Sequence, residues 1–250
     1  MEILTYGKGE RLRVCSSVVA EGCRGDSRII ILPIPTTKDG VTVFGTELSL
    51  SEVCGQVESG TLVAGYGIPE NMAEMIAERG GYIYDALLDE ELVCENAQLT
   101  ALGTLGWILS NMRSSPKELF FGIVGYGRIG KRLLRLLLFL GARVRVYSSN
   151  LSEIRGLIET GIEAVDHRSG ADFSDLDVLI NTAPARIVGS RQIEKCRGIR
   201  VIDLASGNQL SDIEGVVCLP SVPEKCFPES AGRLYAEGIL GHAGRASEGE

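Results

Sequence analysis

The sequence predicts an α/β fold in which parallel strands alternate with helices, arranged as two units. From residue 28 onward, apolar runs of strand length alternate with segments whose apolar residues have helical spacing. In the middle of the chain, a glycine motif joins one apolar run directly to a helix. The hydrophobic content of 44% suits a globular protein. No apolar run approaches the roughly 18 residues that a membrane-spanning helix requires.

Residues 120–130, Phe-Phe-Gly-Ile-Val-Gly-Tyr-Gly-Arg-Ile-Gly, predict a dinucleotide-binding turn. An apolar strand ends in Gly125-x-Gly127-x-x-Gly130, and a helix is expected over 128–140. In such a turn the first glycine permits the bend, the second admits the pyrophosphate, and the third lets helix and strand pack closely. The alternative is a glycine-rich turn without a ligand. We interpret the motif as the start of a Rossmann-type doubly wound parallel sheet.

The second half of the chain supplies the rest of that sheet. Strands are expected at 144–147, 178–181, 199–204 and 216–219, with helices at 151–160 and 190–196. Ligands of such sheets bind at the carboxyl ends of the strands. The cofactor-binding residues expected there are Gly125, Tyr126, Gly127, Arg128, Ile129, Gly130, Ser148, Ser149, Asn150, Asn181, Thr182, Ala183, Pro184, Asp203, Ala205 and Ser206.

The first half predicts a second, smaller α/β unit. Strands are expected at 28–35, 61–66 and 82–84, and helices at 69–78, 96–112 and 230–240. Residues 1–27 show no clear periodicity, so no structure is predicted for them. We expect residues 1–113 and 223–250 to form this unit, and residues 114–222 to form the dinucleotide-binding unit.

Charge and cysteine usage exclude several classes of protein. The net charge of −8 argues against general nucleic-acid binding, which needs clustered lysine and arginine. The seven cysteines contain no CxxC pair, and the two histidines have no metal-ligand spacing. The start of the sequence lacks the basic and apolar regions of a signal peptide. We therefore expect a cytoplasmic protein with reduced thiols, no metal and no contact with a membrane.

Four segments of the chain resemble the A-subunit family of dipicolinate synthase. This family belongs to a wider group that includes D-2-hydroxyacid dehydrogenases and S-adenosylhomocysteine hydrolase. The segments are 31–40 (Ile-Leu-Pro-Ile-Pro-Thr-Thr-Lys-Asp-Gly), 125–130, 180–184 with 202–206, and 219–232. The resemblance runs from about residue 28 to about residue 240, and the first and last segments are its most specific parts.

The resemblance implies an NADP(H)-dependent oxidoreductase of the kind involved in sporulation. Its substrate would be a dihydrodipicolinate-type cyclic dicarboxylate, and its partner a flavoprotein-like second subunit. We also expect a homo-oligomer. No catalytic acid or base is assigned, because hydride transfer belongs to the nicotinamide.

The resemblance also singles out residues for the substrate. Thr36, Thr37 and Asp39 are candidates for binding carboxylates at a strand end, the alternative being a Thr/Asp/Gly turn. Lys225 is either a ligand of an acidic substrate or a solvated lysine. Ser230 is expected to cap the final helix, where an anion also fits. The complete expected set is Pro35, Thr36, Thr37, Asp39, Asn96, Thr100, Lys225 and Ser230.

Three features depart from the family pattern. The glycine-rich β–α unit with which the family begins is not evident in residues 1–27. Leu102 stands where the family has glutamate, and Glu224 stands where it has glycine. These departures leave a second hypothesis open, a catalytically silent dinucleotide-binding regulatory or scaffold protein. A D-2-hydroxyacid-dehydrogenase-like enzyme is a third, although residues 205–210 lack the arginine that it would need.

The end of the second strand of the sheet decides the expected cofactor. An NAD site usually places a carboxylate there, roughly 20 residues past the glycines, to bond the ribose 2′-hydroxyl. Here that position reads Tyr147-Ser-Ser-Asn150, with Arg155 further along. Hydroxyl, amide and N–H groups accept a 2′-phosphate that a carboxylate would repel. The sequence therefore predicts a preference for NADP(H) over NAD(H).

Overall fold

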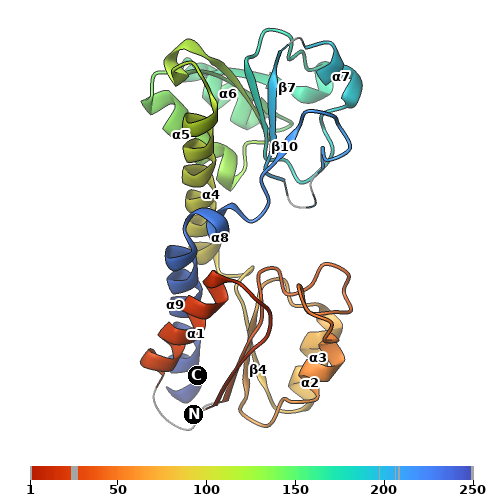
Figure 1. Ribbon diagram of the computed structural model, residues 1–250, viewed down its shortest axis with the longest axis vertical. Helices are drawn as coiled ribbons and strands as arrows, with labels where there is room; N and C mark the ends of the chain where they lie inside the picture. The colour runs from red at the N-terminus through yellow and green to blue at the C-terminus, as the bar shows by residue number, and fades with distance from the viewer. Residues whose placement is uncertain (1, 24–27, 197, 206, 208, 249–250) are drawn as a thin grey trace. The chain divides into compact units, whose positions relative to one another are not determined.

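A computed structural model describes residues 2–23, 28–196, 198–205, 207 and 209–248 (Figure 1). The chain divides into two compact units: unit 1 is Met1–Asn96 with Pro223–Glu250, and unit 2 is Ala97–Val222. Each unit contains one parallel sheet, of four strands in unit 1 and six in unit 2. Among the described helices, none combines the length and the apolar character needed to cross a membrane.

The sheet of unit 2 has the strand order of a dinucleotide-binding sheet. Its order is β10-β9-β8-β5-β6-β7, so the chain winds outward from β5 in one direction and from β8 in the other. The strands are β5 (Phe120–Val124), β6 (Arg143–Ser148), β7 (Glu163–Asp166), β8 (Val178–Asn181), β9 (Arg200–Asp203) and β10 (Val217–Cys218). Ligands of such sheets bind where the winding reverses, beyond the carboxyl ends of β5 and β8.

Both faces of this sheet are covered. Phe121 and Ile123 pack in the core that contains residues of α5 (Arg128–Phe139) and of the last part of α4 (Glu90–Asn111). Phe120 and Val124 pack on the opposite face, in a core with Phe173. The remaining helical segments of unit 2 are η1 (Pro116–Glu118), α6 (Leu151–Glu159), η2 (His167–Ser169) and α7 (Ser190–Glu194). The predicted Rossmann-type doubly wound sheet is therefore confirmed, and burial on both faces explains why β5 is continuously apolar.

Unit 1 places its four strands in sequence order. They are β1 (Glu2–Thr5), β2 (Arg28–Ile31), β3 (Leu62–Gly65) and β4 (Tyr82–Asp85). Helices α1 (Glu10–Gly22) and α9 (Pro228–Glu248) lie side by side on one face, and α2 (Leu50–Cys54) and α3 (Glu70–Glu78) cover the other (Figure 1). Alternate residues of β2 serve the two cores: Ile29 and Ile31 join the α1–α9 core, while Ile30 joins the α2–α3 core.

The amino-terminal β–α unit is present, which corrects the expectation that it was missing. Strand β1 leads through Gly7 and Gly9, whose φ angles are 105° and 125°, into α1. This region is hard to recognise because β1 is at the edge of its sheet and none of its four residues is fully buried, so it lacks the continuous apolar run of the inner strands. The buried side of α1 also contains an arginine, Arg11, among its apolar residues.

Two further expectations change. The division between the units falls inside α4 rather than after it, because Leu92 belongs to the core of unit 1 while Ala101 and Ile108 belong to that of unit 2. Ser230 is not a helix cap. Helix α9 begins at Pro228, since proline suits the first helical position, and Ser230 lies within its first turn.

The α1–α9 contact yields a test of unit 1. A methyl group on Gly232 would lie 2.7 Å from the carbonyl oxygen of Arg11 and 2.7 Å from Cβ of Val14. We expect Gly232→Ala to lower the free energy of unfolding by about 1–3 kcal/mol, because neither neighbour is the end of a flexible side chain. Gly241→Ala, on the same helix but with nothing within 4 Å, is the control. It should raise stability by about 0.5–1 kcal/mol. Equal changes in the free energy of unfolding for the two variants, measured by urea denaturation, would contradict the close packing of Gly232 against α1.

Candidate functional site

The three motif glycines of unit 2 have three different environments. Gly125 has a φ of 94°, and a methyl group there would lie 2.8 Å from Thr182 Oγ1. A methyl group on Gly130 would collide with the carbonyl oxygen of Gly125. Gly127 has no atom within 4 Å of the position that its Cβ would take. The first and third glycines therefore build the turn, while the second leaves the backbone open to an incoming group.

Helix α5 starts directly at this open backbone. Gly127 occupies the N-cap position without a side-chain cap, and the first turn contains no acidic residue. The unpaired N–H groups and the positive end of the helix dipole therefore favour an anion there. Thr182 holds the turn in place, because its hydroxyl lies 3.0 Å from the carbonyl oxygen of Val124 and 3.2 Å from that of Gly125. Thr182 is thus a positioning residue whose hydroxyl is already used.

Asn181 and Asp203 are also used within the protein. The Asn181 amide donates to Asp203 Oδ1 over 2.8 Å, and both side chains are only 1% exposed. Asp203 in turn accepts from the backbone N–H groups of Ala205 (3.1 Å) and Leu210 (2.9 Å). These bonds shape the loops after β8 and β9. The sequence analysis expected both side chains to bind the cofactor, but both are already bonded within the protein. The exposed Pro184 remains on the β8 loop, and Ser206 lies outside the described residues.

A carboxylate from the first turn of α6, Glu153, reaches the end of β6, where the sequence shows none. Ser148 is buried, and its hydroxyl donates to Glu153 Oε2 over 3.1 Å. The Asn150 side chain accepts from Ser152 N (3.0 Å) and Glu153 N (3.4 Å) as the cap of α6. Of the three groups expected to receive a 2′-phosphate, Ser149 is the one with an exposed side chain that is not engaged in a cap or a buried bond.

Two basic side chains lie near this strand end. Lys131 Nζ is 3.2 Å from Glu153 Oε1, and an Arg168 guanidinium nitrogen donates to the Ser149 carbonyl oxygen over 2.8 Å. Arg168 also pairs with Asp166. Neither cation was singled out from the sequence, because Lys131 comes from the helix after the glycines and Arg168 follows the next strand.

The residues expected to bind substrate carboxylates form a turn. Thr36 is fully buried, and its hydroxyl accepts from Tyr66 N over 2.7 Å. The Asp39 carboxylate accepts from the Thr42 hydroxyl (2.6 Å), Thr42 N (2.8 Å), Val41 N (2.8 Å) and the Thr37 hydroxyl (3.0 Å). The bonds from Thr42, then Val41, hold the pKa of Asp39 well below its ordinary value. The alternative, a Thr/Asp/Gly turn, is the interpretation that the geometry supports.

The other expected substrate residues are scattered. Asn96 is half-buried in unit 1, whereas Thr100, one helical turn further along α4, is buried in unit 2. Lys225, in α8 (Val222–Cys226), and Ser230 are exposed in unit 1. Pro35 is half-buried and follows a cis peptide bond. Within unit 1, Lys225 and Ser230 are thus the expected groups that are open to a ligand.

Arg11 is the residue that the sequence reasoning missed. It is 4% exposed, and its Nε has no hydrogen-bond partner among the described residues. Burial lowers the pKa of Arg11, and the charge of Glu224 opposes that shift. The available signal was an arginine directly beside Leu12 in a buried helical stripe that continues with Cys15 and Val19.

The described residues thus form a two-unit α/β protein whose second unit is a Rossmann-type sheet. Solved structures share this fold over nearly the whole chain. The dipicolinate synthase A-subunit from Bacillus halodurans matches with a TM-score of 0.78 and 19% identity, covering 97% of each chain. The corresponding chain from Bacillus subtilis matches with a TM-score of 0.80 and 17% identity, covering 100% of this chain and 98% of that one.

A more distant structure shares the fold as well. It is the D-isomer specific 2-hydroxyacid dehydrogenase from Lactobacillus delbrueckii ssp. bulgaricus in its NAD-complexed form. It has a TM-score of 0.52 and 11% identity, and the match covers 100% of this chain and 98% of that one. No family model and no curated protein sequence matches the chain. The resemblance to the dipicolinate synthase A-subunit is therefore confirmed at the level of the fold.

The glycine environments separate folding from ligand binding. We expect Gly130→Ala to lower the free energy of unfolding by about 1–3 kcal/mol, because the new methyl group meets the Gly125 carbonyl. Gly127→Ala should leave stability nearly unchanged, since its φ of −81° suits alanine and the space is open. Gly127→Ala should nevertheless weaken binding of a dinucleotide measured by calorimetry. Wild-type affinity in Gly127→Ala would contradict close approach of a ligand at this residue.

Proposed function

We propose that this protein is a nicotinamide-dinucleotide-dependent oxidoreductase. The observation that supports this most strongly is the open backbone of Gly127 at the start of α5, between two glycines that are required by packing. The strand order places this turn at the reversal point of the sheet, where such sheets bind ligands. A pyrophosphate fits the site because no side chain caps the start of the helix and no acidic side chain occupies its first turn.

The proposed reaction is oxidation of a dihydrodipicolinate-type cyclic dicarboxylate, which the resemblance to the dipicolinate synthase A-subunit implies. Support comes from the shared fold and from the four similar sequence segments. With nicotinamide bound, the dihydro ring gives one hydride to NADP⁺ and one proton to water, which leaves an aromatic ring and NADPH. The role of the protein is then to orient the ring and to hold its carboxylates, for which Lys225 is the exposed cation carried over from the resemblance.

We propose NADP(H) as the preferred cofactor. Lys131 and Arg168 supply positive charge around the end of β6, and Ser149 exposes its hydroxyl there. Glu153 and Asp166 are the opposing groups, and their charges are paired with Lys131 and Arg168 respectively. A 2′-phosphate is favoured when Lys131 exchanges its carboxylate partner for the phosphate.

Glu153 provides the test of cofactor choice. We expect Glu153→Gln to increase affinity for NADPH by about tenfold, because the substitution removes a like charge and frees Lys131, while affinity for NADH changes little. Glu159→Gln, on the exposed end of the same helix, removes the same charge away from the strand end and is the control. Titration calorimetry with both cofactors gives the measurement. Comparable dissociation constants of the wild-type protein for NADPH and NADH would contradict the preference.

The second candidate function is a dinucleotide-binding regulatory or scaffold protein. It is favoured by Leu102, half-buried where the family has an acid, and by the engagement of Thr36 and Asp39 in a turn. A scaffold requires the nucleotide site alone. An enzyme requires in addition that the cyclic dicarboxylate bind and turn over.

Turnover separates the two candidates. We expect oxidation of dihydrodipicolinate coupled to NADPH formation, with a gain in Leu102→Glu and a loss of about tenfold or more in kcat/KM for Lys225→Ala. Lys195→Ala, an exposed lysine of unit 2, is the matched control. The assay is run with and without a flavoprotein-like partner. Tight NADPH binding without turnover in any combination would establish the scaffold instead.

A further inference from the structure

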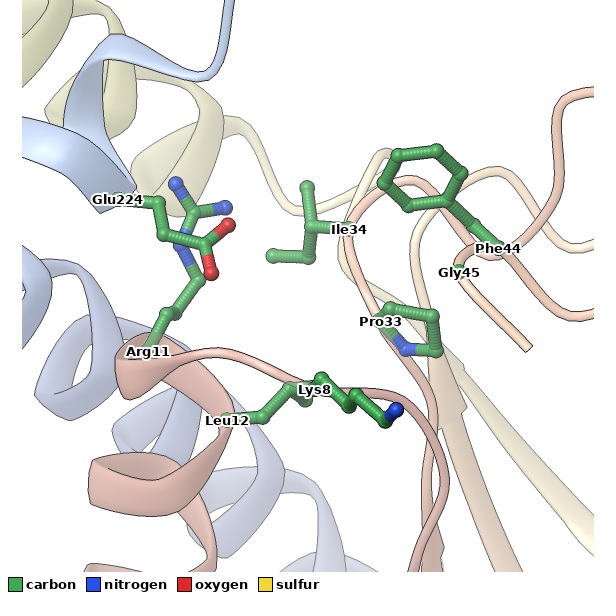
Figure 2. Close-up of a pocket in the computed structure, with 8 residues that line it drawn as sticks. All are labelled: Lys8, Arg11, Leu12, Pro33, Ile34, Phe44, Gly45 and Glu224. Atoms are coloured by element: carbon green, nitrogen blue, oxygen red, sulfur yellow. The ribbon is translucent and has the colours of Figure 1, made fainter.

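Arg11 lies at the end of a small pocket that belongs entirely to unit 1. The pocket has a volume of about 60 Å³. Its charged end contains Arg11 and Glu224, and Leu12, Pro33, Ile34 and Phe44 form an apolar wall (Figure 2). Lys8 lines the pocket from the turn before α1, with its ammonium group directed away from the guanidinium (Figure 2). The pocket therefore combines a buried cation, one acid and an apolar side.

The guanidinium of Arg11 lacks the partners that burial normally demands. An arginine stays charged inside a protein and presents five N–H donors, so a buried one is stabilised by carboxylates or carbonyl groups. Arg11 is 4% exposed, its Nε has no hydrogen-bond partner in the described part of the chain, and its pKa is lowered by burial. A ligand with a carboxylate group would supply the missing acceptors in the bidentate geometry that arginine favours.

Glu224 is held at the edge of the pocket by the shape of the β1–α1 turn. A side chain on Gly9 would overlap Glu224 Oε1, so the carboxylate lies directly against the Gly9 backbone. Glu224 is the acid whose charge acts on Arg11, yet the two form no ion pair among the described residues. The carboxylate oxygens of Glu224 can therefore accept a hydrogen bond from a donor on the ligand. That donor would lie next to the ligand carboxylate that Arg11 binds.

The volume limits what enters. A space of about 60 Å³ is roughly four times the 10–15 Å³ that a cavity needs to hold one water molecule. It accommodates a carboxylate and its neighbouring atom, while the body of the ligand lies toward Pro33, Ile34 and Phe44. We propose that this pocket binds a small carboxylic acid with an N–H donor beside its carboxylate and an apolar body, such as a cyclic α-imino acid. Arg11 receives the carboxylate, and Glu224 accepts from the nitrogen.

Three probes of similar size test the two polar contacts separately. DL-Pipecolate has a ring, a carboxylate and an adjacent ring nitrogen; cyclohexanecarboxylate lacks the nitrogen, and piperidine lacks the carboxylate. Titration calorimetry on the full chain should show binding of pipecolate, at least tenfold weaker binding of cyclohexanecarboxylate, and no binding of piperidine. Equal affinity for the two acids would overturn the role of Glu224. Absence of binding for both acids would overturn the site.

Matched variants assign the contacts. Arg11→Met should abolish pipecolate binding, whereas Arg13→Met, two residues along the same helix and exposed, should preserve it. Glu224→Gln should reduce pipecolate binding to the level of cyclohexanecarboxylate, and the exposed Glu229→Gln should not. Retention of wild-type binding by Arg11→Met would overturn the proposal. If Arg11→Met does not fold, as judged by thermal unfolding, Glu224→Gln decides by the same criterion.

Binding in this pocket can be measured separately from binding at the dinucleotide site. All of the residues that line the pocket belong to unit 1, whereas the glycine turn belongs to unit 2. NADPH binding is therefore measured on the same variants, and Arg11→Met should leave it unchanged. Loss of pipecolate binding with intact NADPH binding in Arg11→Met supports the pocket. Failure of the wild-type protein to bind NADPH would count against the proposed function alone.

Discussion

The close approach of α5 to the end of β5 is the constraint on which unit 2 depends. Gly130 packs so closely against the carbonyl oxygen of Gly125 that a Cβ atom on residue 130 would collide with it. The hydroxyl of Thr182, in the loop after β8, donates to the same carbonyl oxygen. This contact brings the start of α5 over the sheet at the point where the winding reverses. Because packing accounts for Gly125 and Gly130, the freedom around Gly127 is the feature left for a ligand.

The β1–α1 turn of unit 1 and the β5–α5 turn of unit 2 are both rich in glycine but have opposite electrostatic character. In unit 2 the turn before α5 has exposed glycine backbone and no acid in the first helical turn. In unit 1 the turn before α1 also contains glycines with positive φ, but the Glu224 carboxylate covers Gly9, and Glu10 begins the helix. A phosphate is therefore favoured at the turn of unit 2 and repelled at the turn of unit 1. The group proposed to bind an anion in the pocket beside this turn is instead the buried side chain of Arg11.

Many polar residues that attract attention in the sequence serve the backbone. Asp39 organises a turn, Asn181 and Asp203 shape two loops, and Thr36 joins the segment after β2 to the segment after β3. These residues occur at the carboxyl ends of strands, where ligands of such folds also bind. A buried polar group needs a hydrogen-bond partner. Many polar side chains in the loops around a ligand site therefore bond to the loop backbone instead of to the ligand.

The sequence by itself determined the glycine turn and most of the strands and helices from residue 28 onward, although not β7 or α2, because apolar periodicity and a positive φ are properties of short segments. Tertiary structure decided which polar groups remain available, because their partners come from distant segments. The backbone N–H of Tyr66 donates to the Thr36 hydroxyl, and the Ser148 hydroxyl donates to the Glu153 carboxylate. Burial of Arg11 beneath α9 and beside Glu224 likewise joins the two ends of the chain, and no local pattern encodes that meeting.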